Sequence, residues 1–323
     1  MGANSPRRRR RLYYVTLILA AYAATLGLAV VAVVVWLGSG EGEVAGGPGE
    51  ATSQASSAAA RARSDAAVRD RPGWKLVWHD EFRGARCPEA ARWSFEHGFV
   101  RNQELQWYQP RNASCDRGVL DIRARREETP SPNPNYTPGS DDWRTSRPSA
   151  NYTSASLISK RSFTYGRFEM RGRIDTRSGS WPAFWTVGTH DGWPRSGEVD
   201  VFEYYRGSLF ANVCKPRRTQ CGWSSTRQPV AKLGGKKWAG RFHLWAMEWS
   251  ARRIDLFVDG RLVNRFPIVR AVEPGEQNPY VNKRHVLLLS QAIGGTNGGD
   301  PSGTEFPVRF EVDYVRVYRR ADR

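Results

Sequence analysis

The sequence has few metal-binding residues, and no pattern groups them. It contains four cysteines and five histidines. No two cysteines form a C-x-x-C pair and each histidine stands alone, whereas a zinc site needs closely spaced cysteine and histidine ligands. The chain has 323 residues, far too many for a small scaffold held together only by disulfides. These scarcities exclude a zinc module and a disulfide-rich miniprotein.

From Trp74 onward the sequence also lacks amphipathic helices and tandem repeats. Hydrophobic residues recur instead with a period of two, as in the segment 167–174, which is typical of a strand with one buried face. Asp259-Gly260 predicts a tight hairpin turn, and Val286–Leu289 predicts a strand covered on both faces. Many short strands between glycine, proline and asparagine clusters favour one all-β sandwich that occupies residues 74–323.

Acidic residues are outnumbered by basic ones. The chain has 49 lysines and arginines against 32 aspartates and glutamates, a formal charge of +17, and residues 74–323 keep a surplus of +13. Solvated surface charge is the simplest interpretation, and an anionic polysaccharide as substrate stays open. The sequence contains no nucleic-acid-binding motif, so we do not expect nucleic acid as a partner.

One long hydrophobic run is present, near the N-terminus. Residues 12–37 carry no charge and exceed the roughly 20 residues that a helix needs to cross a bilayer. The arginine-rich residues 1–11 predict a cytoplasmic tail, and the small, polar residues 38–73 predict a disordered linker. We therefore expect a single-pass membrane protein with its N-terminus in the cytoplasm and domain 74–323 outside. Secretion after cleavage is the alternative.

All four cysteines follow the hydrophobic run, in the compartment where disulfides form. We expect two bridges, Cys87 with Cys115 and Cys214 with Cys221. The second bridge would close a short basic loop.

Three acidic residues, Glu198, Asp200 and Glu203, stand within six residues of each other. On a regular strand Glu203 would point away from the other two, but a β-bulge at Val201-Phe202 returns it to their face. Two carboxyl groups that lean to within about 5.5 Å are typical of a retaining glycosidase, with one as nucleophile and one as acid and then base. An acidic stripe on a solvated face is the alternative. Hydrophobic neighbours and the upstream segment Trp181–Trp185 disfavour it.

Seven motifs in the extracellular part resemble those of glycoside hydrolase family 16, especially its laminarinase-like members. They are Leu76–Phe82, Asn102–Tyr108, Tyr165–Phe168, Trp181–Trp185, Gly197–Glu203, Phe242–Trp249 and Val312–Tyr318. The resemblance implies a β-jelly roll with a substrate cleft on its concave sheet and no catalytic cofactor. It also implies that Glu198 is the nucleophile, that Glu203 is the acid and base, and that Asp200 tunes Glu198.

The resemblance implies further substrate contacts. Trp181 and Trp185 would line the subsites nearest the scissile bond. Asn102, Gln106 and Tyr108 would hydrogen-bond sugar hydroxyls, unless these three residues serve only the structure of their loop.

Many similar proteins carry a structural calcium ion on the convex side. The residues at the equivalent positions are Glu81, Gly118 and Asp313, whose oxygen ligands would suit calcium. The alternative is that Asp313 is a surface acid paired with Arg316.

The main expectation is a monomeric, retaining endo-glycosidase that acts on a polysaccharide, with β-1,3-glucan as the expected substrate. A transglycosylase would pass the same covalent intermediate to a sugar acceptor, and a galactan or an anionic polysaccharide is a further alternative substrate. A carbohydrate-binding module without catalysis is disfavoured, because both glutamates are present.

Overall fold

The computed structural model describes residues 70–273 and 276–321. The predicted tail 1–11, the predicted membrane segment 12–37 and most of the predicted linker 38–73 lie outside these residues. Within the described part, no helix is both long and apolar enough to cross a membrane.

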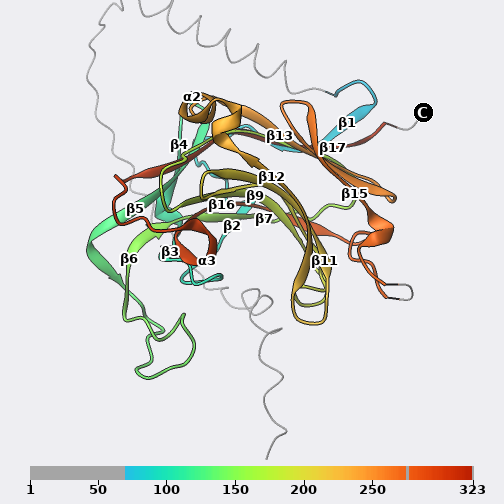
Figure 1. The fold of residues 1–323 in the computed structure, drawn as a ribbon. Helices are drawn as coiled ribbons and strands as arrows, with labels where there is room; N and C mark the ends of the chain where they lie inside the picture. Colours follow the sequence, from blue (N-terminus) through green and yellow to red (C-terminus); the bar gives the residue numbers. More distant parts are fainter. Residues whose placement is uncertain (1–69, 274–275, 322–323) are drawn as a thin grey trace, which may run out of the picture. The chain divides into compact units, whose positions relative to one another are not determined.

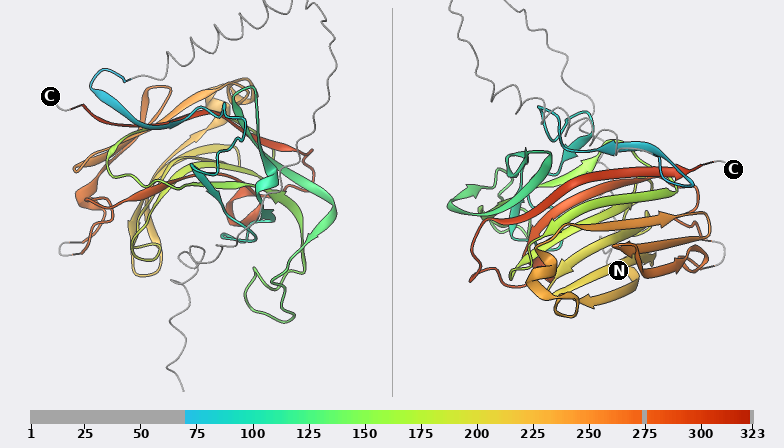
Figure 2. Two further views of the ribbon diagram at one scale, coloured as in Figure 1. Left: turned by 180° about the vertical axis from the view of Figure 1, so that it is seen from behind. Right: turned by 90° about the horizontal axis from the view of Figure 1, so that it is seen from above.

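The described domain consists of two sheets packed face to face (Figure 1). The order of eight strands in the ten-stranded sheet is β15 (Arg261–Pro267), β14 (Arg253–Val258), β13 (His243–Trp249), β8 (Gly166–Ile174), β17 (Val308–Arg320), β5 (Val119–Pro132), β6 (Ser149–Ser154) and β3 (Gln106–Tyr108). The other two strands pair off this path, β1 (Trp74–Asp80) with β17 and β4 (Ala113–Asp116) with β5. The first and last strands, β1 and β17, therefore lie side by side (Figure 2).

The seven-stranded sheet forms the other layer. Its order is β12 (Cys221–Pro229), β11 (Ser208–Pro216), β10 (Glu198–Tyr205), β9 (Ser180–Gly188), β16 (His285–Ile293), β7 (Ser156–Ser159) and β2 (Trp93–Phe95). The helices in the described part are short: η2 (Pro110–Asn112), η3 (Val230–Leu233), α2 (Gly235–Ala239), η4 (Ile268–Arg270) and α3 (Gly295–Gly298). The predicted all-β sandwich is confirmed.

Local sequence patterns explain several of these elements. In β8 the alternating side chains of Phe168, Met170 and Ile174 are buried between the sheets, as the period of two predicts. Asp259 and Gly260 join β14 to β15 with φ angles of 50° and 78°, the positive values that a type I′ hairpin turn requires at both positions. Strand β16 is almost wholly buried because β9 and β7 flank it.

Both predicted disulfides are confirmed. Cys87 bonds to Cys115 with their Cα atoms 5.6 Å apart, and Cys214 bonds to Cys221 with their Cα atoms 5.2 Å apart. The second bridge ties the end of β11 to the start of β12, so it holds the tip of that hairpin.

The domain begins slightly earlier than the predicted boundary at Trp74. The Asp70 carboxylate accepts a hydrogen bond of 2.7 Å from the backbone N–H of Leu76. Arg71 pairs with the buried Glu169 at 2.8 Å. The last residues of the predicted linker are therefore part of the fold.

Candidate active site

A bulge in β10 brings the three predicted acids to one face. Against the neighbouring strand β9, Asp200 pairs with Trp185 and Phe202 pairs with Phe184, so Val201 is the extra residue. The register against β11 shifts at the same place. Val201 and Phe202 are buried in the core, and the Phe202 ring stacks on the Trp245 ring with centroids 4.1 Å apart. The predicted bulge is confirmed, and its apolar residues anchor it.

Glu198, Asp200 and Glu203, called here the cleft carboxylates, all line one pocket. Neutral N–H donors hold them. Trp193 Nε1 donates to Glu198 at 2.6 Å and Trp181 Nε1 donates to Glu203 at 2.8 Å. The amide of Asn212 on β11 donates to Asp200 at 3.1 Å and to Glu203 at 3.0 Å. Within the described residues, no lysine or arginine forms an ion pair with a cleft carboxylate.

Burial shifts the proton affinity of these groups upward. Desolvation raises the pKa of Glu203 to about 7, against the Trp181 N–H, which favours the ionised form. Desolvation and the charges of Glu203 and Glu198 raise the pKa of Asp200 well above its usual value. Desolvation also raises the pKa of Glu198, but the Trp193 N–H and the positive charge of Arg101 oppose that rise. The site therefore holds protons on some carboxyls near neutral pH.

The same pocket also receives residues from β9, β16 and the loop before β3. Its lining is Arg101, Asn102, Glu104, Trp181, Ala183, Trp185, the cleft carboxylates, Ser290 and Ala292. Trp185 donates its N–H to Ser290 at 3.1 Å, and the Arg101 guanidinium lies 5.0 Å from the Trp185 ring centroid. Three of the five predicted substrate contacts, Asn102, Trp181 and Trp185, thus meet at this pocket.

Gln106 and Tyr108 do not reach the pocket surface, which favours the alternative that they serve the structure of their loop. Tyr108 is fully buried and Gln106 is 1% exposed. The Gln106 amide donates to Glu104 at 2.7 Å and accepts from the backbone N–H of Ile293 at 2.7 Å. The Gln106 side chain therefore supports Glu104 and the strand behind it, and the buried Tyr108 side chain does not reach a sugar hydroxyl.

Glu104 is a further pocket carboxylate that the sequence reasoning did not single out. It is 2% exposed, and burial raises its pKa against the nearby charge of Arg101. Glu104 lies inside the segment Asn102–Tyr108, and this position was the sequence feature that could have identified it as a pocket residue. Trp193 and Asn212 were also missed, because only the loop and the register of β11 bring them to the carboxylates.

The predicted calcium ligands do not fit a metal ion. Glu81 receives two hydrogen bonds of 2.8 Å from Arg316, and Asp313 receives one of 2.7 Å from Arg171. Gly118 lies in a turn with the Arg83 side chain against it. Guanidinium groups already bind both carboxylates, and residues 70–273 and 276–321 contain no group of three or more His, Cys, Asp or Glu that could hold a metal ion.

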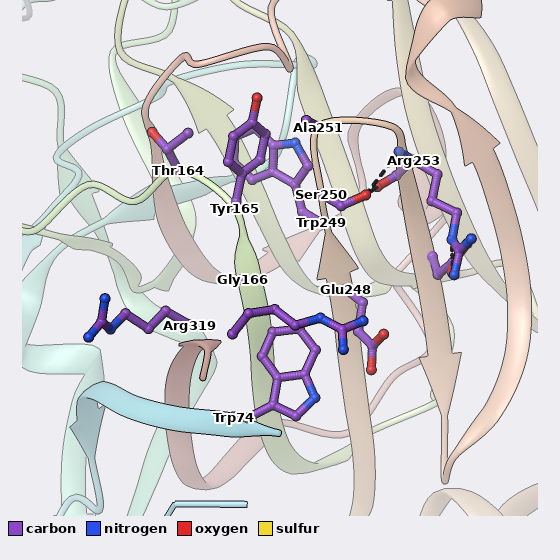
Figure 3. Close-up of a pocket in the computed structure, with 12 residues that line it drawn as sticks. Trp74, Thr164, Tyr165, Gly166, Glu248, Trp249, Ser250, Ala251, Arg253 and Arg319 are labelled. Atoms are coloured by element: carbon purple, nitrogen blue, oxygen red, sulfur yellow. Dashed lines mark hydrogen bonds and ion pairs between the residues drawn. The ribbon is translucent and has the colours of Figure 1, made fainter. Parts of the chain in front are cut away.

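A second and larger cavity, about 320 Å³, lies at the ten-stranded sheet and contains none of the predicted site residues. Figure 3 shows the rings of Trp74 and Tyr165 on opposite sides of Gly166. The acids of this cavity are engaged, because Glu248 binds Arg167 at 2.7 Å and Asp255 binds arginines on its own sheet. This cavity lacks a free acid pair for glycosidase chemistry.

Comparison with known proteins places the chain among carbohydrate-active enzymes. The model of the family "Glycosyl hydrolases family 16" matches residues 135–314. A β-glucanase of Rhodothermus marinus is 34% identical over 284 residues, covering 80% of this chain and 88% of that protein. A glucan endo-1,3-β-glucosidase of Cryptopygus antarcticus is 30% identical, covering 76% of this chain and 92% of that protein.

Solved structures give the same picture. The laminarinase catalytic domain of Thermotoga maritima is 27% identical with a TM-score of 0.66 and covers 78% of this chain and 100% of its own. The laminarinase of Rhodothermus marinus is 34% identical with a TM-score of 0.62, covering 78% and 99%.

Proposed function

We propose that this chain, which belongs to family 16 of the glycosyl hydrolases, cleaves β-1,3-glucan inside the polymer and retains the anomeric configuration. A member of this family is a glycoside hydrolase and needs no catalytic cofactor. The observation that carries the proposal is the bulged strand β10, which gathers the cleft carboxylates in one pocket beside Trp181 and Trp185. The names of the two relatives above support a β-glucan as substrate.

The first chemical step forms a covalent intermediate. Glu198 attacks the anomeric carbon, the bond from that carbon to the glycosidic oxygen breaks, and Glu203 gives its proton to the departing oxygen. A pKa of about 7 keeps Glu203 protonated in mildly acidic to neutral solution. The Trp193 N–H and the charge of Arg101 favour the ionised form of Glu198, which the attack requires.

The second step releases the sugar. Glu203, now ionised, takes a proton from water, and the water oxygen displaces Glu198 from the anomeric carbon. Asp200 stands between the two, and its raised pKa allows it to donate a hydrogen bond to the Glu198 carboxylate. Asp200 therefore orients the nucleophile without joining the displacement.

Product analysis tests this function. The full chain is incubated with laminarin, mixed-linkage β-glucan, agar and carrageenan, with Glu198→Ala as the control. We expect oligosaccharides from laminarin that first appear as the β-anomer by NMR and that are absent with the variant. Cleavage of only agar or carrageenan would replace β-1,3-glucan by a galactan, and products longer than the donor would indicate transglycosylation.

We also propose that residues 12–37 anchor the protein in the membrane as a single-pass helix, with residues 1–11 in the cytoplasm and the enzyme domain outside. The uncharged run and the preceding arginines support this arrangement. Protease treatment of intact cells tests it: the domain should be digested while the N-terminus stays with the membrane. Recovery of a shortened, soluble protein from the medium would favour secretion after cleavage.

A further inference from the structure

Strands β11 and β12 extend the face that carries the cleft carboxylates. Residues directly opposite each other in antiparallel strands point to the same face. Glu203 is opposite Phe210, and Phe210 is opposite Arg227. In the same way Asn212 is opposite Ser225, and Cys214 is opposite Trp223. Strand β12 therefore presents Trp223, Ser225 and Arg227 on the cleft side, and Trp223 is 41% exposed.

These two strands lie on the side of β10 that faces away from the other pocket strands. The pocket residues come from β9, β16 and the loop before β3, all on one side of β10, whereas β11 and β12 lie on the other. Asn212 of β11 holds Glu203, the acid that would protonate the leaving oxygen. Strands are about 4.8 Å apart, so β12 lies about 10 Å beyond β10, a reach of roughly two sugar units.

This side of the cleft is strongly basic. Between Glu203 and Glu248 the chain has nine lysines and arginines and no aspartate or glutamate. Arg217 and Arg218 stand exposed at the hairpin tip held by the second disulfide, and Arg227 is exposed on β12 with its Nε donating to Ser208 at 3.0 Å. In the part of the chain that the structure describes, none of these three guanidiniums forms an ion pair.

We propose that Trp223, Arg217, Arg218 and Arg227, called here the acceptor edge, form a subsite for a glycan chain that carries carboxylate, sulfate or phosphate groups. The Trp223 ring supplies a flat apolar platform for a sugar face. The unpaired guanidiniums bind the anionic groups through charge-assisted hydrogen bonds. The assignment of this edge to the leaving side rests on the proposed function; its preference for an anionic glycan does not.

A binding experiment tests the acceptor edge without turnover. The full chain with Glu198→Ala is titrated with laminarin and with the same laminarin after partial carboxymethylation. We expect at least about 10-fold tighter binding of the carboxymethylated polymer at low ionic strength, and a preference that shrinks as salt screens the charges. Equal dissociation constants for the two polymers would overturn the proposal.

Two sets of variants separate the acceptor edge from general positive charge. Replacement of Arg217, Arg218 and Arg227 by alanine should remove the preference, whereas Lys236→Ala with Lys237→Ala, on α2, should keep it. Trp223→Ala should weaken binding of both polymers alike. An equal loss of preference in the α2 variant would show unspecific attraction and contradict the acceptor edge. If the wild type cleaves no β-glucan, the proposed function fails while the binding preference is still measured.

Discussion

Carboxylates are buried in both sheets of this protein, but their surroundings differ. In the seven-stranded sheet the cleft carboxylates are held by the N–H groups of indole and amide side chains. In the ten-stranded sheet, Arg316 grips Glu81 with two hydrogen bonds, and Asp255 is held by two arginines. The cleft carboxylates have raised pKa values and face a pocket, whereas Glu81 and Asp255 form ion pairs with arginines.

Carboxylates thus serve two purposes in this fold, catalysis in one sheet and stability in the other. A guanidinium beside a carboxylate favours the ionised form, so the group holds no proton to donate near neutral pH and its oxygens are occupied by the ion pair. A neutral donor positions the carboxylate but leaves burial to raise its pKa, which is what acid–base catalysis near neutral pH needs. Variants on the two sheets should therefore fail in opposite ways.

The largest expected effect is at the nucleophile. Glu198→Ala should lower kcat on β-glucan by about 10⁴-fold or more, because no covalent intermediate forms. Its thermal midpoint should not fall, since the variant removes a half-buried, desolvated carboxylate whose charge opposes that of Asp200. Added azide should restore cleavage and yield a glycosyl azide of inverted configuration. Normal turnover by Glu198→Ala would contradict the assigned role.

The acid and base comes next. Glu203→Gln should lower kcat on polymer by about 10² to 10⁴-fold, with a smaller effect on the first step for an aryl glycoside whose leaving group needs no proton.

The pKa of Glu203 is raised in the fold, so ionisation destabilises the protein as pH rises from about 4.5 through about 7. We therefore expect Glu203→Gln to raise Tm in alkaline but not in acidic buffer. A uniform Tm change across pH would speak against this ionisation.

The matching change on the ten-stranded sheet should affect stability and spare the chemistry. Arg316→Met leaves Glu81 buried without its partner and should lower the free energy of unfolding by about 3 to 5 kcal/mol. The kcat of the folded fraction should stay unchanged. Denaturant unfolding measures the change in stability, and initial rates measure kcat. Adding Glu81→Gln to this variant should recover part of the stability. A lower kcat of the folded Arg316→Met protein would contradict the conclusion that the pair of Glu81 and Arg316 serves stability alone.

Smaller effects should separate the two indole donors. Trp193→Phe removes a hydrogen-bond donor that favours ionised Glu198, so the pKa of Glu198 should rise. The acidic limb of the pH dependence of kcat/KM should then move to higher pH. Trp181→Phe removes the equivalent donor from Glu203, so the alkaline limb should move to higher pH. Each shift should be below about one pH unit. If the same limb moved in both variants, the assignment of Glu198 as nucleophile and Glu203 as acid and base would be contradicted.

The smallest expected effect is that of metal removal. Glu81 and Asp313 are bound by arginines, so EDTA should leave Tm and activity unchanged within error. Calcium added back should change neither. A clear loss of stability in EDTA would show that the ten-stranded sheet binds a metal after all.

Sequence reasoning succeeded where local rules decide the outcome. The alternation in 167–174, the turn at Asp259-Gly260 and the bulge at Val201-Phe202 follow from the two-residue period of a strand and from the conformations that turns demand. Both disulfides also join cysteines that are neighbours in sequence order.

Sequence reasoning failed where distant segments meet. Gln106 was a candidate for sugar binding, but β16 passes behind it. The side-chain oxygen of Gln106 accepts a hydrogen bond from the backbone N–H of Ile293. Glu81 was expected to bind calcium, yet strand pairing with β17 places it beside Arg316, 235 positions further along the chain. Asn212 reaches two carboxylates only because the register of β11 sets it opposite Asp200.

The all-β class, the three acids on one face and the two cysteine pairs could be predicted without a structure, because each depends on spacing over a few tens of residues or fewer. Which carboxylates have a raised pKa and which form ion pairs with arginines could be seen only in the folded chain. That outcome depends on which strands become neighbours. The free energy of a buried charge depends on the groups within a few ångströms in space, wherever those groups stand in the chain.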